Sequence, residues 1–193
     1  MGAGPSRSRY ERRELGCLFQ TSEGVGAPMS RVVDRLAELG LELPTAPTPL
    51  ASYVPAVHTG SLVFTSGQLP IQNGEMIATG LVHSDPDLAE VQFDLAKTCA
   101  RIAILNALAA VSSVIGDLDA VVRTVRVVGY VASVPGFDAQ PKVIDGASEL
   151  LADVFHDAGQ HARSAIGVSA LPLNSPVEVE LVVEVSGEPR RAW

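Results

Sequence analysis

The chain has few of the residues that build specialised folds. Only two of its 193 residues are cysteines, Cys17 and Cys99, and they provide no disulfide framework, so a cytoplasmic protein is expected. Aromatic residues make up 5% and charged residues 19% of the chain, whereas hydrophobic residues reach 47%. This composition, rich in Val, Ala and Leu, predicts one soluble domain with an aliphatic core that folds without metal or disulfide support.

Long hydrophobic runs are also missing. No stretch approaches the ~18 apolar residues of a membrane span, and the longest apolar-rich stretch, Ile102 to Ile115, is broken by Asn106, Ser112 and Ser113. The first residues are rich in Gly, Ser and Arg and lack the apolar segment of a signal peptide. We therefore expect no membrane association.

Positive charge is scarce. The net charge of the chain is −8; residues 1–29 hold four arginines and three acids, a net of +1, so the remainder carries −9. A negative surface repels phosphate backbones, which argues against nucleic acid as a partner.

Residues 1–29 also differ from the rest in pattern. Gly, Ser and Pro alternate there with little periodicity, which predicts a flexible N-terminal extension followed by a single domain over residues 30–193. Met29 offers a second possible start codon, so the extension is either untranslated or a functional basic tail.

The domain opens with a short predicted helix. Ser30 precedes the helical stretch 31–39, Gly40 ends it, and the proline-rich segment Leu43 to Leu50 is expected to be extended. Strands are predicted at Tyr53-Val54, at 62–65 and at 76–82, with the Asn73-Gly74 pair as a hairpin turn.

Two long helices and three further strands follow in the prediction. The first helix runs from Asp85-Pro86 to Gly116, with a core stripe of Leu88, Val91, Leu95, Cys99, Ile102 and Leu105. The second runs from Pro141 to Ala158. A strand over 121–131, which places Arg123 and Arg126 on opposite faces, lies between them. The last two strands are separated by Leu171-Pro172, and the final one buries every second residue from Val177 to Val185.

This order, β-β-β-α-β-α-β-β, predicts an α+β fold: a single mixed sheet with two helices packed on one face. The other face carries Val and Leu as well as Glu. It is therefore expected to be covered by another subunit, with binding sites between subunits.

Motifs for several kinds of chemistry are absent. The sequence has no Gly-rich phosphate loop, no paired Cys motif and no nucleophile elbow. Its four histidines lack metal-ligand spacing, and no Ser/His/Asp set can be selected from sequence alone. We expect neither a metal nor a cofactor.

Three residues are candidates for a site that binds a small acid. Arg163, at the entrance of an apolar strand, either forms a surface salt bridge or binds a substrate carboxylate through its planar guanidinium. Glu178 is either a solvated acid on an alternating strand or a group that orients water and moves a proton. Tyr53 is either a packing aromatic or a lid over the ligand.

Together these residues resemble the RidA (YjgF) family, also known as perchloric-acid-soluble ribonuclease-like or translation-inhibitor-like proteins. The resemblance covers about residues 48 to 185. It rests on Tyr53, TSGQLP at 65–70, Arg163-Ser164, Leu171-Pro172 and VEVE at 177–180.

The resemblance implies a chorismate-mutase-like homotrimer with ligand clefts between subunits, and cofactor-free hydrolysis of reactive 2-imino acids to 2-keto acids and ammonia. Arg163 would then bind the substrate carboxylate and Glu178 would activate water. Tyr53 would close the pocket, and the backbone near Gly67 and Ala165 would face the substrate.

Two residues depart from the usual family pattern. Ala165 stands where many members have Cys, and Asp145 stands where Asn is usual, which adds negative charge near an anionic ligand. The sequence therefore leaves two hypotheses: an active deaminase, or a non-catalytic trimer that binds small carboxylates. The ribonuclease label is disfavoured by the −9 balance of the domain.

Overall fold

The computed structural model describes Met1 and residues 31–46, 52–85 and 87–187. The extension predicted for residues 1–29 lies outside the described residues apart from Met1. So do Cys17, the predicted cap Ser30, Pro86 and part of the proline-rich segment.

A five-stranded mixed sheet forms the centre of the fold. Its strands are β1 (Ala56–Thr59), β2 (Leu62–Thr65), β5 (Val121–Ala132), β6 (Ala162–Val168) and β7 (Val177–Val185). They lie in the order β1-β2-β7-β5-β6, and β6 runs parallel to β5 whereas the other neighbours are antiparallel. The strict alternation of buried Val or Leu with half-buried residues along β7 gives the sheet one apolar face, as predicted.

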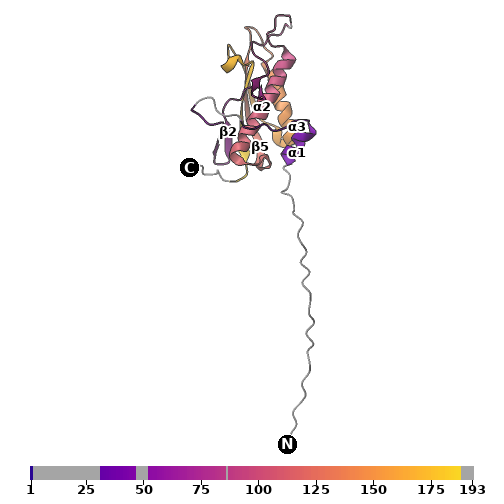
Figure 1. Ribbon diagram of the computed structural model, residues 1–193, viewed down its shortest axis with the longest axis vertical. Helices are drawn as coiled ribbons and strands as arrows, with labels where there is room; N and C mark the ends of the chain where they lie inside the picture. The colour runs from indigo at the N-terminus through magenta and orange to yellow at the C-terminus, as the bar shows by residue number, and fades with distance from the viewer. Residues whose placement is uncertain (2–30, 47–51, 86, 188–193) are drawn as a thin grey trace.

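Two long helices cover that face. α2 (Phe93–Ile115) packs against β1, β2 and β7, and α3 (Gln140–Phe155) packs against β5 and β6. Figure 1 shows the two helices side by side, with the short α1 (Arg31–Glu38) next to α3. The predicted arrangement of two helices on one face of the sheet is confirmed.

The two long helices approach closely at Gly146. A Cβ atom built there would collide with the backbone carbonyl oxygen of Lys97 and lie 3.0 Å from its Cγ atom. Only a residue without a side chain allows α3 to pack this tightly on α2.

Three 3₁₀ turns connect the main elements: Leu118–Ala120, His156–Gly159 and Pro172–Asn174. The first of them holds the N-terminus of α1, because the Asp119 carboxylate accepts hydrogen bonds from the backbone N–H groups of Arg31 and Val32 at 3.0 and 2.9 Å.

The first predicted strands need correction. Tyr53 lies in a bend, Val54 lies in no strand, and β1 begins at Ala56. The predicted strand at 76–82 is wrong: a separate hairpin of β3 (Ile71–Gln72) and β4 (Glu75–Met76) takes its place, turning at Asn73-Gly74 as predicted. The amide of Asn106 in α2 donates to the carbonyls of Leu69 and Ile71, both at 2.9 Å, which ties this hairpin to the helix rather than to the main sheet.

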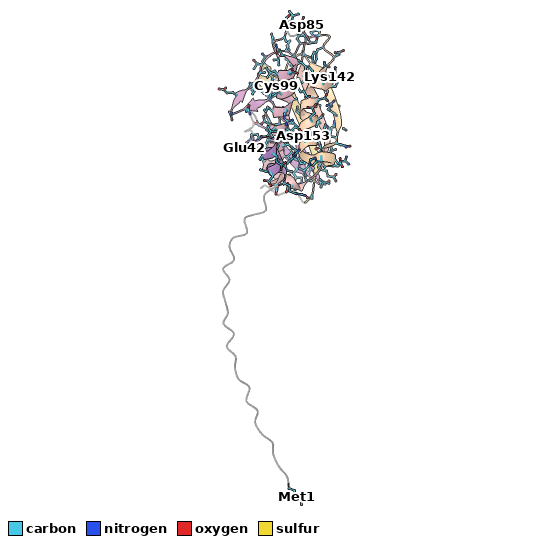
Figure 2. The ribbon with its side chains drawn as sticks, turned by 90° about the vertical axis from the view of Figure 1, so that its right-hand side faces the viewer. Met1, Glu42, Asp85, Cys99, Lys142 and Asp153 are labelled. Carbon is cyan, nitrogen blue, oxygen red and sulfur yellow. The ribbon has the colours of Figure 1, made fainter. Side chains whose placement is uncertain are left out.

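The predicted start of the long helix at Asp85 is also wrong. Val91 N–H donates to the Leu81 carbonyl at 3.2 Å, and Val82 bridges Val91. The described residues between them form bends and turns rather than a helix, and α2 begins only at Phe93. Leu88, predicted in the core, is 69% exposed. Asp85 lies at one end of the folded part, far from Asp153 of α3 (Figure 2).

The remainder of the predicted stripe of α2 belongs to the core, except for the exposed Leu95. Cys99 is fully buried among aliphatic side chains, and this burial raises its pKa to about 12. By length and mean hydropathy (1.7) α2 could also cross a membrane. Its packing against the sheet and α3 accounts for this composition equally well.

A bulge in β5 changes the predicted placement of its arginines. Arg123 is opposite Glu184 of β7 and Arg126 is opposite Val182, so the pairing shifts by one residue between Thr124 and Arg126. Both arginines therefore lie on the face of the sheet that the helices leave open, not on opposite faces.

Candidate functional site

Arg163 points toward α3. Its partner in the parallel pairing is Val127, which is fully buried under the helices, so both side chains project from the helix-covered face. The Arg163 Nη1 atom donates to Asp145 Oδ1 at 2.8 Å and to Ser148 Oγ at 3.0 Å. Asp145 and Ser148 lie three residues apart on α3, which places them on one side of the helix.

His161 extends this hydrogen-bonded group. Its Nδ1 atom is 2.6 Å from the Gly159 carbonyl oxygen, and its Nε2 atom is 3.0 Å from Ser148 Oγ. Because a carbonyl only accepts, Nδ1 carries a proton, and in the tautomer whose one proton is on Nδ1 the Nε2 atom accepts from the Ser148 hydroxyl. Ser148 thus donates to His161 and accepts from Arg163, which fixes the position of the guanidinium. We call Asp145, Ser148, His161 and Arg163 the clamp group.

Glu178 lies on the other face of the sheet. It occupies a half-buried position on β7 opposite Tyr130 of β5, and its carboxyl group lies directly over Gly67. A Cβ atom at position 67 would collide with Glu178 Oε1 and lie 2.6 Å from its Cδ atom, so this approach needs glycine.

The environment of Glu178 favours its protonated form. Burial raises the pKa of Glu178, and the neighbouring Glu180 carboxylate raises it further. The Tyr130 hydroxyl lies 3.5 Å from Glu180 Oε1. Burial and the Glu180 charge raise the pKa of Tyr130 as well. Gly67, Tyr130, Glu178 and Glu180 are called the acid group below.

The loop around Gly67 is attached firmly to β7. Gln68 and Val179 exchange two backbone hydrogen bonds, at 2.8 and 2.9 Å. Ser66 donates through its Oγ atom to the Val54 carbonyl at 2.7 Å, which brings the bend containing Tyr53 next to this loop. Tyr53 itself is 49% exposed at this margin of the sheet. These bonds bring the segment of Tyr53 close to Gly67, although the strand predicted at Tyr53-Val54 does not exist.

Ala165 is opposite Gly129 and packs against the core on the helix-covered face. It therefore shares a face of β6 with Arg163, two residues away, as expected for alternating side chains.

One chain does not bring Arg163 and Glu178 together. β5 separates their strands, so the two strands lie roughly 10 Å apart, and their side chains project from opposite faces. A single small acid cannot touch both within one subunit. A shared cleft remains a prediction that requires a second copy of the chain.

Sequence reasoning missed four members of these groups: Ser148, His161, Tyr130 and Glu180. A signal existed for two of them, because Ser148 follows Asp145 by three residues on a helix and His161 precedes Arg163 by two residues near a strand. Tyr130 lies on a strand in which alternate residues are buried. Its place in the acid group follows only from the pairing of β5 with β7, which the sequence does not reveal.

Other kinds of site are not evident in the described part of the chain. Within residues 31–46, 52–85 and 87–187, no group of three or more His, Cys, Asp or Glu side chains could hold a metal ion. A cavity of about 750 Å³ lies between α2, the β3–β4 hairpin and residues 40–45. None of its lining residues belongs to the clamp group or the acid group.

Solved structures resemble this chain over most of its length. Atu1372 from Agrobacterium tumefaciens, a protein of unknown function, is 41% identical with a TM-score of 0.74, covering 81% of this chain and 93% of that one. Escherichia coli TdcF, solved with bound serine, is 25% identical with a TM-score of 0.51, covering 73% and 94%.

Proteins related by sequence also match this chain over most of its length. Protein TCP17 of Trypanosoma cruzi is 37% identical over 157 residues, covering 81% of this chain and 95% of the relative. A 2-iminobutanoate/2-iminopropanoate deaminase of Dermatophagoides farinae is 29% identical over 147 residues, covering 75% and 94%. Residues 33–185 match the family described as "YjgF/chorismate mutase-like, putative endoribonuclease". The chain therefore belongs to the YjgF/RidA family and has its chorismate-mutase-like α+β fold.

Proposed function

We propose that the protein hydrolyses reactive 2-imino or enamine acids to 2-keto acids and ammonia. The observation that carries this proposal is a half-buried carboxyl group, Glu178, held over Gly67 with a raised pKa. A carboxyl group whose pKa is raised above its usual range holds a proton more readily, so it can both accept and return a proton during one reaction. The deaminase of Dermatophagoides farinae supports this choice of reaction, since it is a relative at 29% identity.

The chemistry needs little beyond orientation and proton transfer. Water adds to the C=N carbon of the imino acid, a proton moves to the nitrogen, and the C–N bond breaks to release ammonia and leave a C=O group. Glu178 would take the proton from the attacking water and return it to the departing nitrogen. Arg163 would hold the substrate carboxylate so that the reacting carbon faces Glu178.

This assignment requires a site shared by two subunits, and we propose a homotrimer. The open face of the sheet supports it, because Phe64 and Ile166 on this face are 43% and 45% exposed and Val57 and Val122 also face solvent. An apolar face of this kind is usually covered by a partner. A second subunit docked there could bring its own clamp group to the acid group of the first.

A non-catalytic trimer that binds small carboxylates is the second candidate. One observation favours it: the Asp145 carboxylate already occupies Nη1 of Arg163. TdcF, solved with bound serine, shows that a family member at 25% identity binds a small amino acid.

The test couples the purified full-length protein to a dehydratase that releases 2-aminoacrylate and follows keto-acid formation. We expect faster formation than in buffer. The rate should fall by about 10²–10⁴ in Glu178→Gln, which removes the proton-transfer group, and by at least about 10² in Arg163→Ala, which removes the orienting contact.

Glu184→Gln is the matched control, because Glu184 lies on the same strand and face but pairs with Arg123 outside the acid group. Its rate should equal that of the wild type. A wild-type rate no faster than buffer, with the assembly intact by light scattering, would contradict deaminase activity. Binding of 2-keto acids without turnover would favour the second candidate.

A further inference from the structure

The clamp group contains the ion pair between Arg163 and Asp145. In each of these side chains, some of the charged atoms remain available to bind a ligand. Arg163 uses only Nη1 for its bonds to Asp145 and Ser148, and among the described residues no protein acceptor bonds its Nε or Nη2 atoms. Likewise, among those residues only Oδ1 of Asp145 is engaged. The two side chains are 26% and 42% exposed, so a small ligand can reach both.

We propose that Asp145 and Arg163 together recognise a zwitterionic ligand, a 2-iminium or 2-amino acid. The Arg163 guanidinium takes the carboxylate and the Asp145 carboxylate takes the protonated nitrogen on the adjacent carbon. This inference rests on the proposed role of Arg163 as the carboxylate clamp. It deepens that role by naming the charge state of the ligand.

The geometry indicates that Asp145 and Arg163 recognise the ligand together, rather than Arg163 alone. Ser148 and the His161 ring behind it hold the guanidinium next to Asp145. A ligand carboxylate bound to Arg163 therefore lies close to a fixed negative charge. It is repelled by that charge unless the ligand brings a positive charge of its own.

A zwitterion fits this arrangement because its charges alternate with those of the protein. The carboxylate and the nitrogen of a 2-amino or 2-iminium acid sit on neighbouring atoms, as the Arg163 and Asp145 charges do at 2.8 Å. Each ligand charge then faces an opposite one.

The consequence is discrimination between substrate and product. A 2-keto acid has the same carboxylate but no cation, so the hydrolysis product is repelled by Asp145 once the nitrogen has left. The same site would accept 2-amino acids, which are stable zwitterions, as competing ligands.

The experiment measures binding of three compounds with one carbon skeleton to the full-length protein by calorimetry: L-2-aminobutyrate, 2-hydroxybutyrate and 2-ketobutyrate. All three carry the carboxylate, and only the first carries a cation. We expect the wild type to bind the amino acid at least about tenfold more tightly than either of the others. In Asp145→Asn this preference should disappear, with tighter binding of the keto acid.

Glu149→Gln is the matched control, since Glu149 lies on the same helix and loses the same charge but pairs with Lys97 at 2.7 Å. It should keep the wild-type preference. Equal binding of the three compounds by the wild type, or an unchanged preference in Asp145→Asn, would overturn the inference. The comparison of the amino and hydroxy acids on wild-type protein decides the matter even if Asp145→Asn does not fold.

If the proposed role of Arg163 as the carboxylate clamp is wrong, the binding experiment gives a different result. If Arg163→Ala abolishes binding of all three compounds while the wild type shows no preference, the clamp stands and only the zwitterion inference is wrong. If Arg163→Ala binds them as the wild type does, the clamp role is wrong, and the inference fails with it.

Discussion

At the scale of single residues, the environment of Glu178 differs from that of the other acids on its strand. Glu178, Glu180 and Glu184 share one face of β7. Glu178 lies over Gly67 and next to Glu180, whereas Glu184 is opposite Arg123. Alternation in the sequence places all three on one face. The neighbours that distinguish them come from β2, from the loop after it and from β5.

The raised pKa of Glu178 predicts a pH-dependent cost to stability. The folded state keeps this proton to higher pH than the unfolded chain does, so stability is lost as the pH rises through the folded-state pKa. Glu178→Gln removes that cost. Thermal melts should therefore show a melting temperature about 1–3 °C above that of the wild type at pH 7, and no gain below about pH 4.

Glu184→Gln provides the comparison, because it removes a negative charge opposite Arg123 and should bring no stabilisation at pH 7. An equal gain in both variants would mean that overall charge, rather than the site around Glu178, is responsible.

At the scale of elements, the sequence predicted an element correctly where the element's own residue pattern fixes its structure. The prediction was wrong where contacts with a distant element fix it. The alternation of buried residues along β7 was predicted correctly. The strand predicted at 76–82 was not, because Asn106 of α2 holds the preceding hairpin and Val82 bridges Val91 and Ser133 instead. The bulge in β5 could not be predicted either, because nothing in the run of Val, Arg and Thr residues marks where the pairing shifts.

The close approach of α3 to α2 predicts that Gly146→Ala destabilises the protein. Alanine favours a helix over glycine by about 1 kcal/mol. Its Cβ atom would nevertheless collide with the Lys97 carbonyl, and overpacking of this kind typically costs ~1–3 kcal/mol. We expect a lower midpoint in chemical denaturation.

Ala152→Gly, on the exposed side of the same helix, is the control and should lose about 1 kcal/mol through helix propensity alone. If Gly146→Ala raised the midpoint instead, the tight contact between the helices would not limit their packing.

At the scale of the whole molecule, the clamp group and the acid group lie on opposite faces of one sheet. Each is organised within the chain: the clamp group by α3 and β6, the acid group by β5, β7 and the loop at Gly67. If both act on one ligand, they must come from different subunits. The exposed apolar side chains of the open face provide the surface for such an assembly.

Sharing between subunits predicts complementation between two inactive variants. Arg163→Ala and Glu178→Gln are each expected to lack activity. When they are unfolded together and refolded as mixed trimers, the assembly proposed above, some interfaces combine an intact Arg163 with an intact Glu178. For random assembly of a site built from two subunits, about a quarter of the sites are complete, so about a quarter of the wild-type rate should return.

The same variants refolded separately and then mixed serve as the control and should stay inactive if subunits do not exchange. No recovery in verified mixed trimers would mean that the two residues do not serve one intersubunit site.

The fold class, the helix-covered face of the sheet and the family could all be predicted from the amino-acid sequence. These follow from local periodicity and short motifs, which each segment carries within itself. Arg163, Glu178, Gly67 and Asp145 were also predicted from the sequence as site residues. Three features follow only from the folded chain: Arg163 pairs with Asp145, Glu178 lies over Gly67, and the two groups face opposite sides of the sheet. They could not be predicted because strand order, a bulge and a helix contact fix these neighbours, and each joins residues far apart in the chain.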